Sequence, residues 1–241
     1  MNKIAIFVEG QTERIFVIEF LKELLGGEHK FSRIEEKFTN QNRSELIATR
    51  IFPNAEFFIL IFDASGDGNV LPALFDRSEN MIKNQDFKCL IAMQDLYDRP
   101  RNKKSIIIRK FNEHKRVFDF SERLKFVLAI MEIEAWFLAD YRLFEKLYPP
   151  ANPNFLKEKL DIDLVEKNPE LYKHPSEIIN KIFQLFDRKY QKTETQAYKI
   201  ISNLDFDFLY SDKVLQQVKS LKYFVDCIEK ALFDDIDNDL K

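Results

Sequence analysis

The sequence predicts an α/β protein with a mostly parallel sheet flanked by helices. Over the first half of the chain, short apolar runs typical of buried strands alternate with segments of helical spacing. Beyond about residue 148 no convincing strand occurs, and the remaining segments have helical patterns. We therefore expect an α/β domain over residues 1–148 and a helical C-terminal region over residues 149–241 packed on it.

The individual elements follow from the spacing of apolar residues. Buried strands are predicted at 4–8, 56–62, 88–93 and 125–130. Residues 31–38 fit a short strand or irregular structure. Helices are predicted at 12–25, 44–51, 70–82, 111–118, 131–147, 176–186, 194–201 and 212–232. Gly26 and Gly27 are expected to end the first of these helices.

Composition limits the classes of function. The 241 residues carry 37 Lys and Arg against 40 Asp and Glu, so the net charge of −3 excludes a general nucleic-acid-binding surface. A phosphate-bearing partner would then require a local basic patch or bound metal ions. Cys89 and Cys227 lie in apolar segments and are expected in the core. We expect a cytoplasmic protein without a membrane span, because no apolar run approaches 18 residues.

The first candidate site follows the first predicted strand. Residues 4–13 read IAIFVEGQTE, which places Glu9 at the carboxyl tip of that strand and Glu13 inside the next helix. Gly10 would let the backbone turn sharply between the two elements. Ligands of open α/β sheets bind at this edge. The structural alternative is a surface glutamate that caps a helix.

Asp95 follows another apolar strand, and in a parallel sheet it would share an edge with Glu9. Two carboxylates at neighbouring strand tips repel each other unless a cation lies between them or one is protonated. Oxygen ligands of this kind suit Mg²⁺ or Mn²⁺. The alternative for Asp95 is a helix cap or a turn.

Two further segments carry candidate residues. In MEIEAWFLAD, residues 131–140, Glu132 and Glu134 would point to different faces of a helix, so at most one is expected to bind a metal directly, and Glu134 is favoured. Lys192 could offset charge that develops on a phosphoryl oxygen, although a lone lysine is commonly solvated. The basic cluster at 99–104 fits either a contact to a nucleic-acid backbone or a solvated loop.

These segments resemble motifs of the Toprim superfamily. The VEG-x-TE pattern of residues 8–13 is most similar to overcoming-lysogenization-defect nucleases and to a small uncharacterised bacterial Toprim-like family. Residues 131–140 resemble the HEFEALLFSD segment of that small family and the FE-x-W-L segment of related restriction-linked proteins. Lys192 matches the lysine of a Tyr-x-Lys-Thr segment in such relatives. The chain departs from the Toprim pattern at Tyr97, where a second aspartate is usual, so Asp98 or water would have to replace it.

The resemblance implies a metal-dependent nuclease of a bacterial defence or restriction-linked system. Mg²⁺ or Mn²⁺ would be held by Glu9, Asp95 and Glu134, while Glu13 would hold a second ion or act as the base, and Lys192 would be catalytic. The expected substrate is nucleic acid, with DNA favoured over RNA. An ATPase partner would be a separate polypeptide, because the chain has no Walker loop. The alternatives are a non-catalytic binding subunit and, third, phosphoryl or nucleotidyl transfer as in primases.

Overall fold

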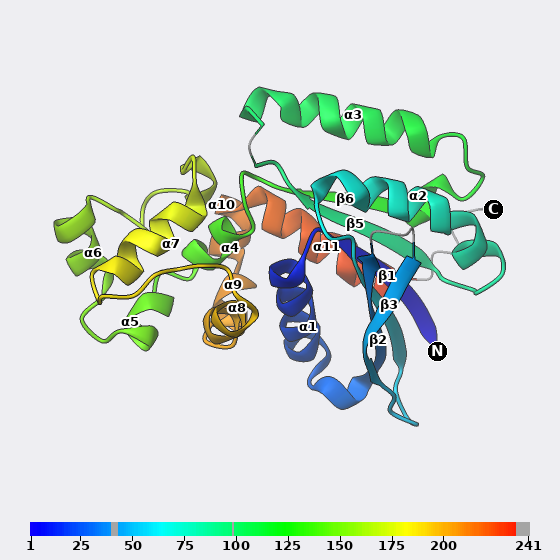
Figure 1. Cartoon of the computed structure of the whole chain (residues 1–241), viewed down its shortest axis with the longest axis horizontal. Helices are drawn as coiled ribbons and strands as arrows, with labels where there is room; N and C mark the ends of the chain where they lie inside the picture. Colours follow the sequence, from blue (N-terminus) through cyan, green and yellow to red (C-terminus); the bar gives the residue numbers. More distant parts are fainter. Residues whose placement is uncertain (40–42, 98, 235–241) are drawn as a thin grey trace. The chain divides into compact units, whose positions relative to one another are not determined.

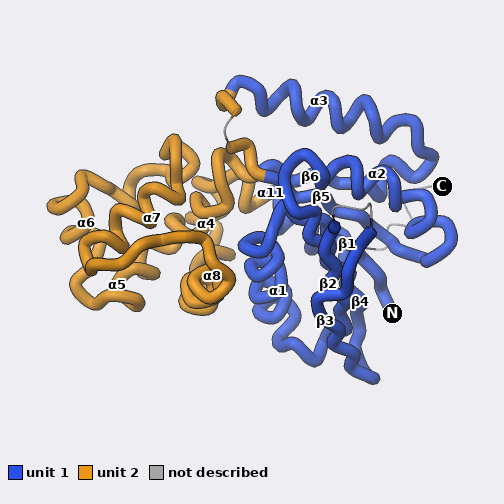
Figure 2. The backbone as a smooth tube through the Cα atoms, viewed as in Figure 1, with its two compact units in different colours: residues 1–94, 102–128, 223–241 blue, residues 95–101, 129–222 orange. Residues whose placement is uncertain are grey.

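The chain forms two compact units that are interleaved along the sequence (Figure 2). The computed structural model describes residues 1–39, 43–97 and 99–234. The first unit comprises residues 1–94, 102–128 and 223–241, and the second comprises residues 95–101 and 129–222. These limits differ from the predicted division at residue 148. Asp98, the predicted substitute for a second Toprim aspartate, lies outside the described residues.

The sheet has six strands in the order β3-β2-β4-β1-β5-β6. Their bounds are β1 Asn2–Val8, β2 Phe31–Thr39, β3 Arg43–Arg50, β4 Phe57–Asp63, β5 Cys89–Asp95 and β6 Leu124–Ala129. Strand β1 pairs in parallel with β4 and β5, β2 pairs in parallel with β4, and β3 runs antiparallel to β2. The predicted mostly parallel α/β architecture is therefore confirmed.

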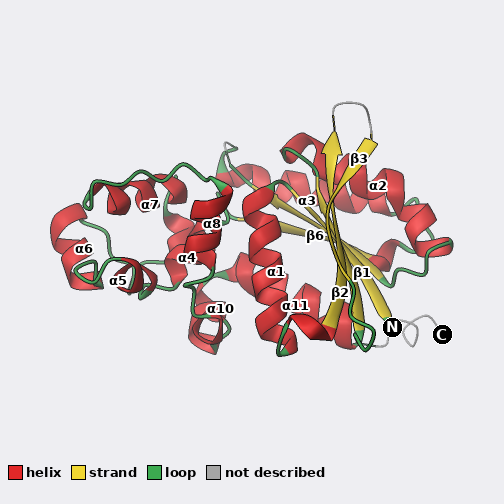
Figure 3. Ribbon diagram, turned by 60° about the horizontal axis from the view of Figure 1, so that its bottom comes forward, coloured by secondary structure: helices red, strands yellow, loops and turns green. Residues whose placement is uncertain are grey.

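Helices of the first unit cover both faces of this sheet (Figures 1 and 3). They are α1 Gln11–Leu25, α2 Asp67–Lys83, α3 Lys104–Lys115 and the part of α11 (Lys219–Phe233) from Tyr223 onward. On one face the rings of Phe16 in α1 and Phe224 in α11 lie 5.8 Å apart. On the other face Phe75 of α2 packs on Phe111 of α3 at 5.7 Å. Because both faces are covered, β1, β4 and β5 are apolar almost throughout.

The predicted helix at 44–51 is wrong, because this segment forms the edge strand β3. Its pairing with β2 extends from Arg33 opposite Arg50 to Thr39 opposite Arg43. The register shifts between Glu35 and Glu36, so that Ile47 forms a bulge. An eight-residue helix has little intrinsic stability, whereas pairing satisfies the backbone of β2 along its outer edge. Residues 31–38, left open by the sequence, belong to strand β2.

The second unit is helical, as predicted for the chain beyond residue 148. Its helices are α4 Glu134–Ala139, α5 Leu143–Leu147, α6 Pro153–Leu160, α7 Pro175–Gln184, α8 Glu194–Ile201, α9 Phe206–Leu209 and α10 Asp212–Gln217. The predicted helix 131–147 is interrupted at Asp140, whose buried carboxylate accepts a hydrogen bond from Asp205 N at 2.8 Å. Within the described ranges no helix combines the length and apolar character needed to cross a membrane.

The aromatic contact between α1 and α11 gives a stability prediction for the first unit. The side chain of Phe16 is 0% exposed, so Phe16→Ala should lower the free energy of unfolding by about 3–5 kcal/mol through lost burial and a cavity. Phe233, at the end of α11, is 56% exposed, and Phe233→Ala should cost less than about 1 kcal/mol. Urea unfolding monitored by circular dichroism measures both, and equal losses would contradict the assigned packing.

Candidate functional site

The connections at the carboxyl edge of the first unit diverge after β1 and β4. Strand β1 leads into α1 on one face of the sheet, whereas β4 leads into α2 on the opposite face (Figure 1). Backbone hydrogen bonds join the two loops: Ala64 N donates to Val8 O at 2.9 Å, and Gly66 N donates to Glu9 O at 2.8 Å. Open α/β sheets bind ligands where the connections of adjacent strands diverge.

Glu9 and Glu13 both lie at this edge of the first unit. Glu9 follows the last residue of β1, and Glu13 is a buried residue in the first turn of α1. A Cβ atom at Gly10 would lie 3.6 Å from Oε2 of Glu13, which places that carboxylate beside the loop. Gly10 itself is extended, with φ −167°. The predicted need for a glycine turn at this position is therefore wrong.

Asp63 is an acid at this edge that the sequence analysis did not select. It ends β4, opposite Val8 of β1, and its side chain is buried. Burial raises the pKa of Asp63, although a hydrogen bond from Ser65 N and the charges of Lys37 and Arg14 oppose that rise. Ser65 has a φ of 56°, a conformation that residues with a side chain rarely adopt. Asp63 follows the apolar run of residues 56–62, and a position directly after an apolar run is the same signal that identified Glu9.

In the second unit, Asp95 is held beside the segment that contains Glu132 and Glu134. Leu96 N donates to Ala129 O at 2.9 Å, and Tyr97 N donates to Met131 O at 2.7 Å. Oδ1 of the buried Asp95 accepts a hydrogen bond from Ile133 N at 3.0 Å. These three bonds fix the Asp95 carboxylate against the start of α4.

Lys192 bridges the two glutamates of this segment. Its Nζ atom lies 3.2 Å from Oε1 of Glu132 and 2.9 Å from Oε1 of Glu134. The structure thus brings Asp95, Glu134 and Lys192 into one cluster of the second unit. Glu9 and Glu13 are described within the first unit, so a shared site with that cluster stays a prediction.

The electrostatics of the cluster leave negative charge in excess. Burial lowers the pKa of Lys192, but the charges of Glu134, Glu132 and Asp95 and the hydrogen bond to Glu134 outweigh that effect, so the pKa is raised. The lysine therefore remains an ammonium group. One ammonium shared by Glu132 and Glu134 cannot neutralise both carboxylates.

One carboxylate oxygen of this cluster lacks a donor among the described residues. Oε1 of Glu134 accepts a hydrogen bond from the Tyr190 hydroxyl at 2.9 Å, whereas its Oε2 is buried and has no hydrogen-bond partner there. A buried acceptor without a donor costs about 1–3 kcal/mol. An oxygen in this state has the chemistry of a ligand for a hard cation such as Mg²⁺ or Mn²⁺.

The backbone beside the cluster is strained at two positions. Met131 has a φ of 68° and Lys192 a φ of 52°, both in the left-handed region that favours glycine. Such residues persist only where the surrounding contacts enforce them, and they concentrate at binding and catalytic sites. Met131 directly precedes Glu132, so both strained positions adjoin the bridging interaction.

The number of acidic ligands limits the kind of metal site. Across residues 1–39, 43–97 and 99–234, no group of three or more His, Cys, Asp or Glu side chains is arranged to hold a metal ion. Mg²⁺ commonly uses one or two carboxylates and keeps several waters. Glu134 and Asp95 therefore fit in number and chemistry, although a closed cage of protein ligands does not occur in these ranges.

Some residues of the cluster were not selected from the sequence. The backbone N and the hydroxyl of Ser176 each donate to Glu132 at 2.8 Å, and Tyr190 holds Glu134. Tyr190 stands two residues before Lys192, so the motif that gave Lys192 could have indicated it. In the basic cluster, Arg101 donates to the carbonyl groups of Glu170 and Tyr172, which gives this arginine a structural role.

Comparison with known proteins places this site within a defined family. Residues 8–229 match the model of a family described as Domain of unknown function (DUF4276). The chain belongs to the DUF4276 family. The DUF4276 match spans every candidate residue from Glu9 to Lys192. The acids of the first unit and the cluster of the second unit are therefore both part of the family domain. The chain matches no curated protein and no solved structure.

Because the pKa of Asp63 is raised, we expect a neutral residue at this position to increase the stability of the protein in a pH-dependent way. Burial penalises the charged form, so the penalty is absent below the unfolded pKa of about 3.9 and grows as the pH rises through the folded pKa. Asp63→Asn should therefore be more stable than the wild type at pH 7 and lose that advantage near pH 3.5. Thermal unfolding measures both values, with the exposed Asp76→Asn as the control. A less stable Asp63→Asn protein at pH 7 would contradict the argument.

Because Lys192 bridges two glutamates, we expect a second substitution to restore part of the stability that is lost when the lysine is removed. Lys192→Met leaves Glu132 and Glu134 without their shared cation and should cost about 2 kcal/mol, between surface and buried values because the side chain is 43% exposed. Glu134→Gln in the same protein should recover much of that loss. Chemical denaturation checks this result, with Lys173→Met as a matched control in the same unit. Additive losses would show that the residues do not interact.

Proposed function

We propose that the chain is a metal-dependent phosphodiesterase that cleaves nucleic acid. The observation that carries this proposal is the buried Oε2 of Glu134, which has no donor among the described residues and belongs to a carboxylate held beside Lys192. A structural ion pair has no need of an unsatisfied carboxylate oxygen. A cation site next to a lysine is the combination that phosphodiester hydrolysis uses.

Different residues of the second unit would bind the metal ion, position its ligand and contact the phosphate. Asp95 and Glu134 would hold Mg²⁺ or Mn²⁺, which when bound supplies positive charge to the scissile phosphate and lowers the pKa of a bound water. Tyr190 fixes the Glu134 carboxylate through Oε1 and leaves Oε2 available. The partly exposed Lys192 ammonium can donate to a phosphoryl oxygen, while Glu132 keeps it in position.

Residues of the first unit enter the proposal through the sequence. Glu9 and Glu13 are retained as predicted site residues, with Glu13 as a second ligand or the base that takes a proton from water. The resemblance of residues 8–13, 131–140 and 190–193 to Toprim motifs supports this assignment, together with DNA as the favoured substrate. A role in a bacterial defence system, beside a separate ATPase, belongs to the same proposal.

A nicking assay tests the proposed reaction. Supercoiled plasmid DNA is incubated with the wild type in Mg²⁺ or Mn²⁺ and in EDTA, and the nicked and linear products are quantified. Glu134→Gln, Asp95→Asn and Glu9→Gln should each reduce the cleavage rate by about 100-fold or more, because each removes a charge that acts on the reacting phosphate. Glu113→Gln, an exposed change on α3, should retain the wild-type rate.

Metal binding gives a readout that does not depend on activity. Isothermal titration calorimetry with Mn²⁺ should detect binding to the wild type and the Glu113→Gln control, and a loss of at least about tenfold in affinity for Glu134→Gln. Cleavage that survives both Glu134→Gln and Asp95→Asn would refute the proposed site. An intact plasmid together with no Mn²⁺ binding would instead favour the non-catalytic binding subunit.

A further inference from the structure

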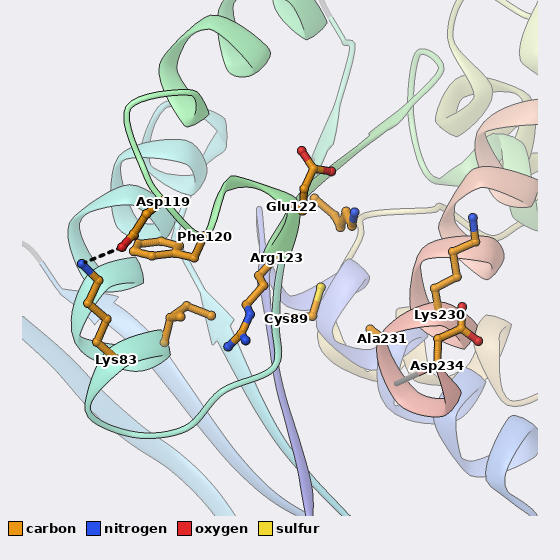
Figure 4. Close-up of a pocket in the computed structure, with 11 residues that line it drawn as sticks. Lys83, Cys89, Asp119, Phe120, Glu122, Arg123, Lys230, Ala231 and Asp234 are labelled. Atoms are coloured by element: carbon orange, nitrogen blue, oxygen red, sulfur yellow. Dashed lines mark ion pairs between the residues drawn. The ribbon is translucent and has the colours of Figure 1, made fainter. Parts of the chain in front are cut away.

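A cavity lies in the first unit, at the amino-terminal edge of the sheet (Figure 4). It has a volume of about 560 Å³, within the usual range for sites that hold a small organic molecule. Its lining comes from the end of α2, the segment before β6, the first residue of β5 and the last turns of α11. Because Cys89 begins β5 and Asp95 ends it, the cavity is at the opposite end of this strand from the candidate acids.

The floor of this cavity is apolar and uncharged. Ile82, Phe120 and Ala231 line it with largely buried side chains. Cys89 adds a thiol whose pKa burial raises to about 12, so the group is neutral at physiological pH. A ligand with an apolar body therefore meets matching surface here, whereas a small hydrated ion does not.

The rim of the cavity carries basic side chains that are not neutralised within the described chain. Lys83 is paired with Asp119 at 3.4 Å, and Glu122 is paired with Lys115 at 3.8 Å. The side chains of Lys125 and Lys230 also line the cavity, yet neither makes a hydrogen bond or ion pair with a described residue. Lys125 lies on β6 and Lys230 on α11, so the two lysines come from different elements of the cavity wall.

We propose that this cavity binds an organic anion with an apolar body and a single carboxylate, sulfonate or phosphate head group. The apolar floor would take the body of the ligand, and Lys125 and Lys230 would bind the head group. Among the described rim residues, Asp119 and Glu122 are held in ion pairs whereas Asp234 is not. Lys125 and Lys230 together therefore leave one positive charge in excess for a monoanion. This site is independent of the proposed nuclease reaction.

A pair of fluorescent probes tests this assignment on the full chain. The first probe is 8-anilinonaphthalene-1-sulfonate, an apolar body with one sulfonate, and the second is its neutral counterpart N-phenyl-1-naphthylamine. In Lys125→Gln/Lys230→Gln, the dissociation constant of the sulfonate probe should rise about tenfold or more. The neutral probe should bind wild type and variant with similar affinity, because it has no head group for the lysines.

A charge-matched control separates the cavity from the rest of the surface. Lys104→Gln/Lys110→Gln removes the same charge from the exposed face of α3 and should change the affinity of the sulfonate probe by less than about twofold. Melting curves by circular dichroism confirm that each variant is folded. Equal losses in the cavity variant and the control, or an equal loss for the neutral probe, would overturn the proposal.

Competition experiments distinguish the head groups. Octanoate and octyl phosphate are titrated against the bound sulfonate probe, and displacement by the first identifies a carboxylate site and by the second a phosphate-ester site. Inorganic phosphate should not displace the probe, because it lacks the apolar body. Displacement by inorganic phosphate at the same concentration as octyl phosphate would refute the amphipathic ligand, as would failure of both octyl compounds.

Discussion

The central position of β1 constrains the architecture of the first unit. This strand is hydrogen-bonded on both sides, by β4 and β5, and residues Ile4 to Val8 are fully buried. A parallel strand in this position requires helices on both faces, which α1 with α11 and α2 with α3 provide. The same constraint sends the connections after β1 and β4 in opposite directions. The apolar strands β4 and β5 accordingly carry their acids, Asp63 and Asp95, at their carboxyl ends.

In the second unit, several carboxylates are buried and are held there by polar partners. Glu132 is held by Ser176 and Lys192, and Glu134 by Tyr190 and Lys192, so the two acids share one cation. Burial of charge on this scale destabilises a fold unless partners offset it. The chain also tolerates left-handed backbone at Met131 and Lys192. Both a strained backbone and incompletely neutralised charge destabilise a fold. Proteins retain them at sites where binding depends on them.

The parts of the fold that could be predicted from the sequence are those governed by apolar periodicity. The strands at 4–8, 56–62, 88–93 and 125–130 were identifiable because parallel strands buried on both faces are continuous apolar runs. The edge strand β3 was not, because its side chains are exposed and only pairing with β2 makes it a strand. Likewise Asp95 and Lys192 could be selected by position and motif. Tyr190 belongs to the same motif as Lys192, whereas Ser176 contacts Glu132 only through tertiary structure, which local sequence does not encode.

The exposed strand β3 also determines where the sheet stops. An unpaired edge offers backbone groups to any other extended chain, and the side chains of Leu46 and Ile47 on this strand are exposed. The bulge at Ile47 increases the local twist and interrupts the regular alternation of donors and acceptors. Arginines at both ends of the strand, Arg43 and Arg50, add like charges that repel another copy aligned antiparallel across the middle of the strand. The bulge and the two arginines therefore oppose the regular pairing of a second extended chain along this strand.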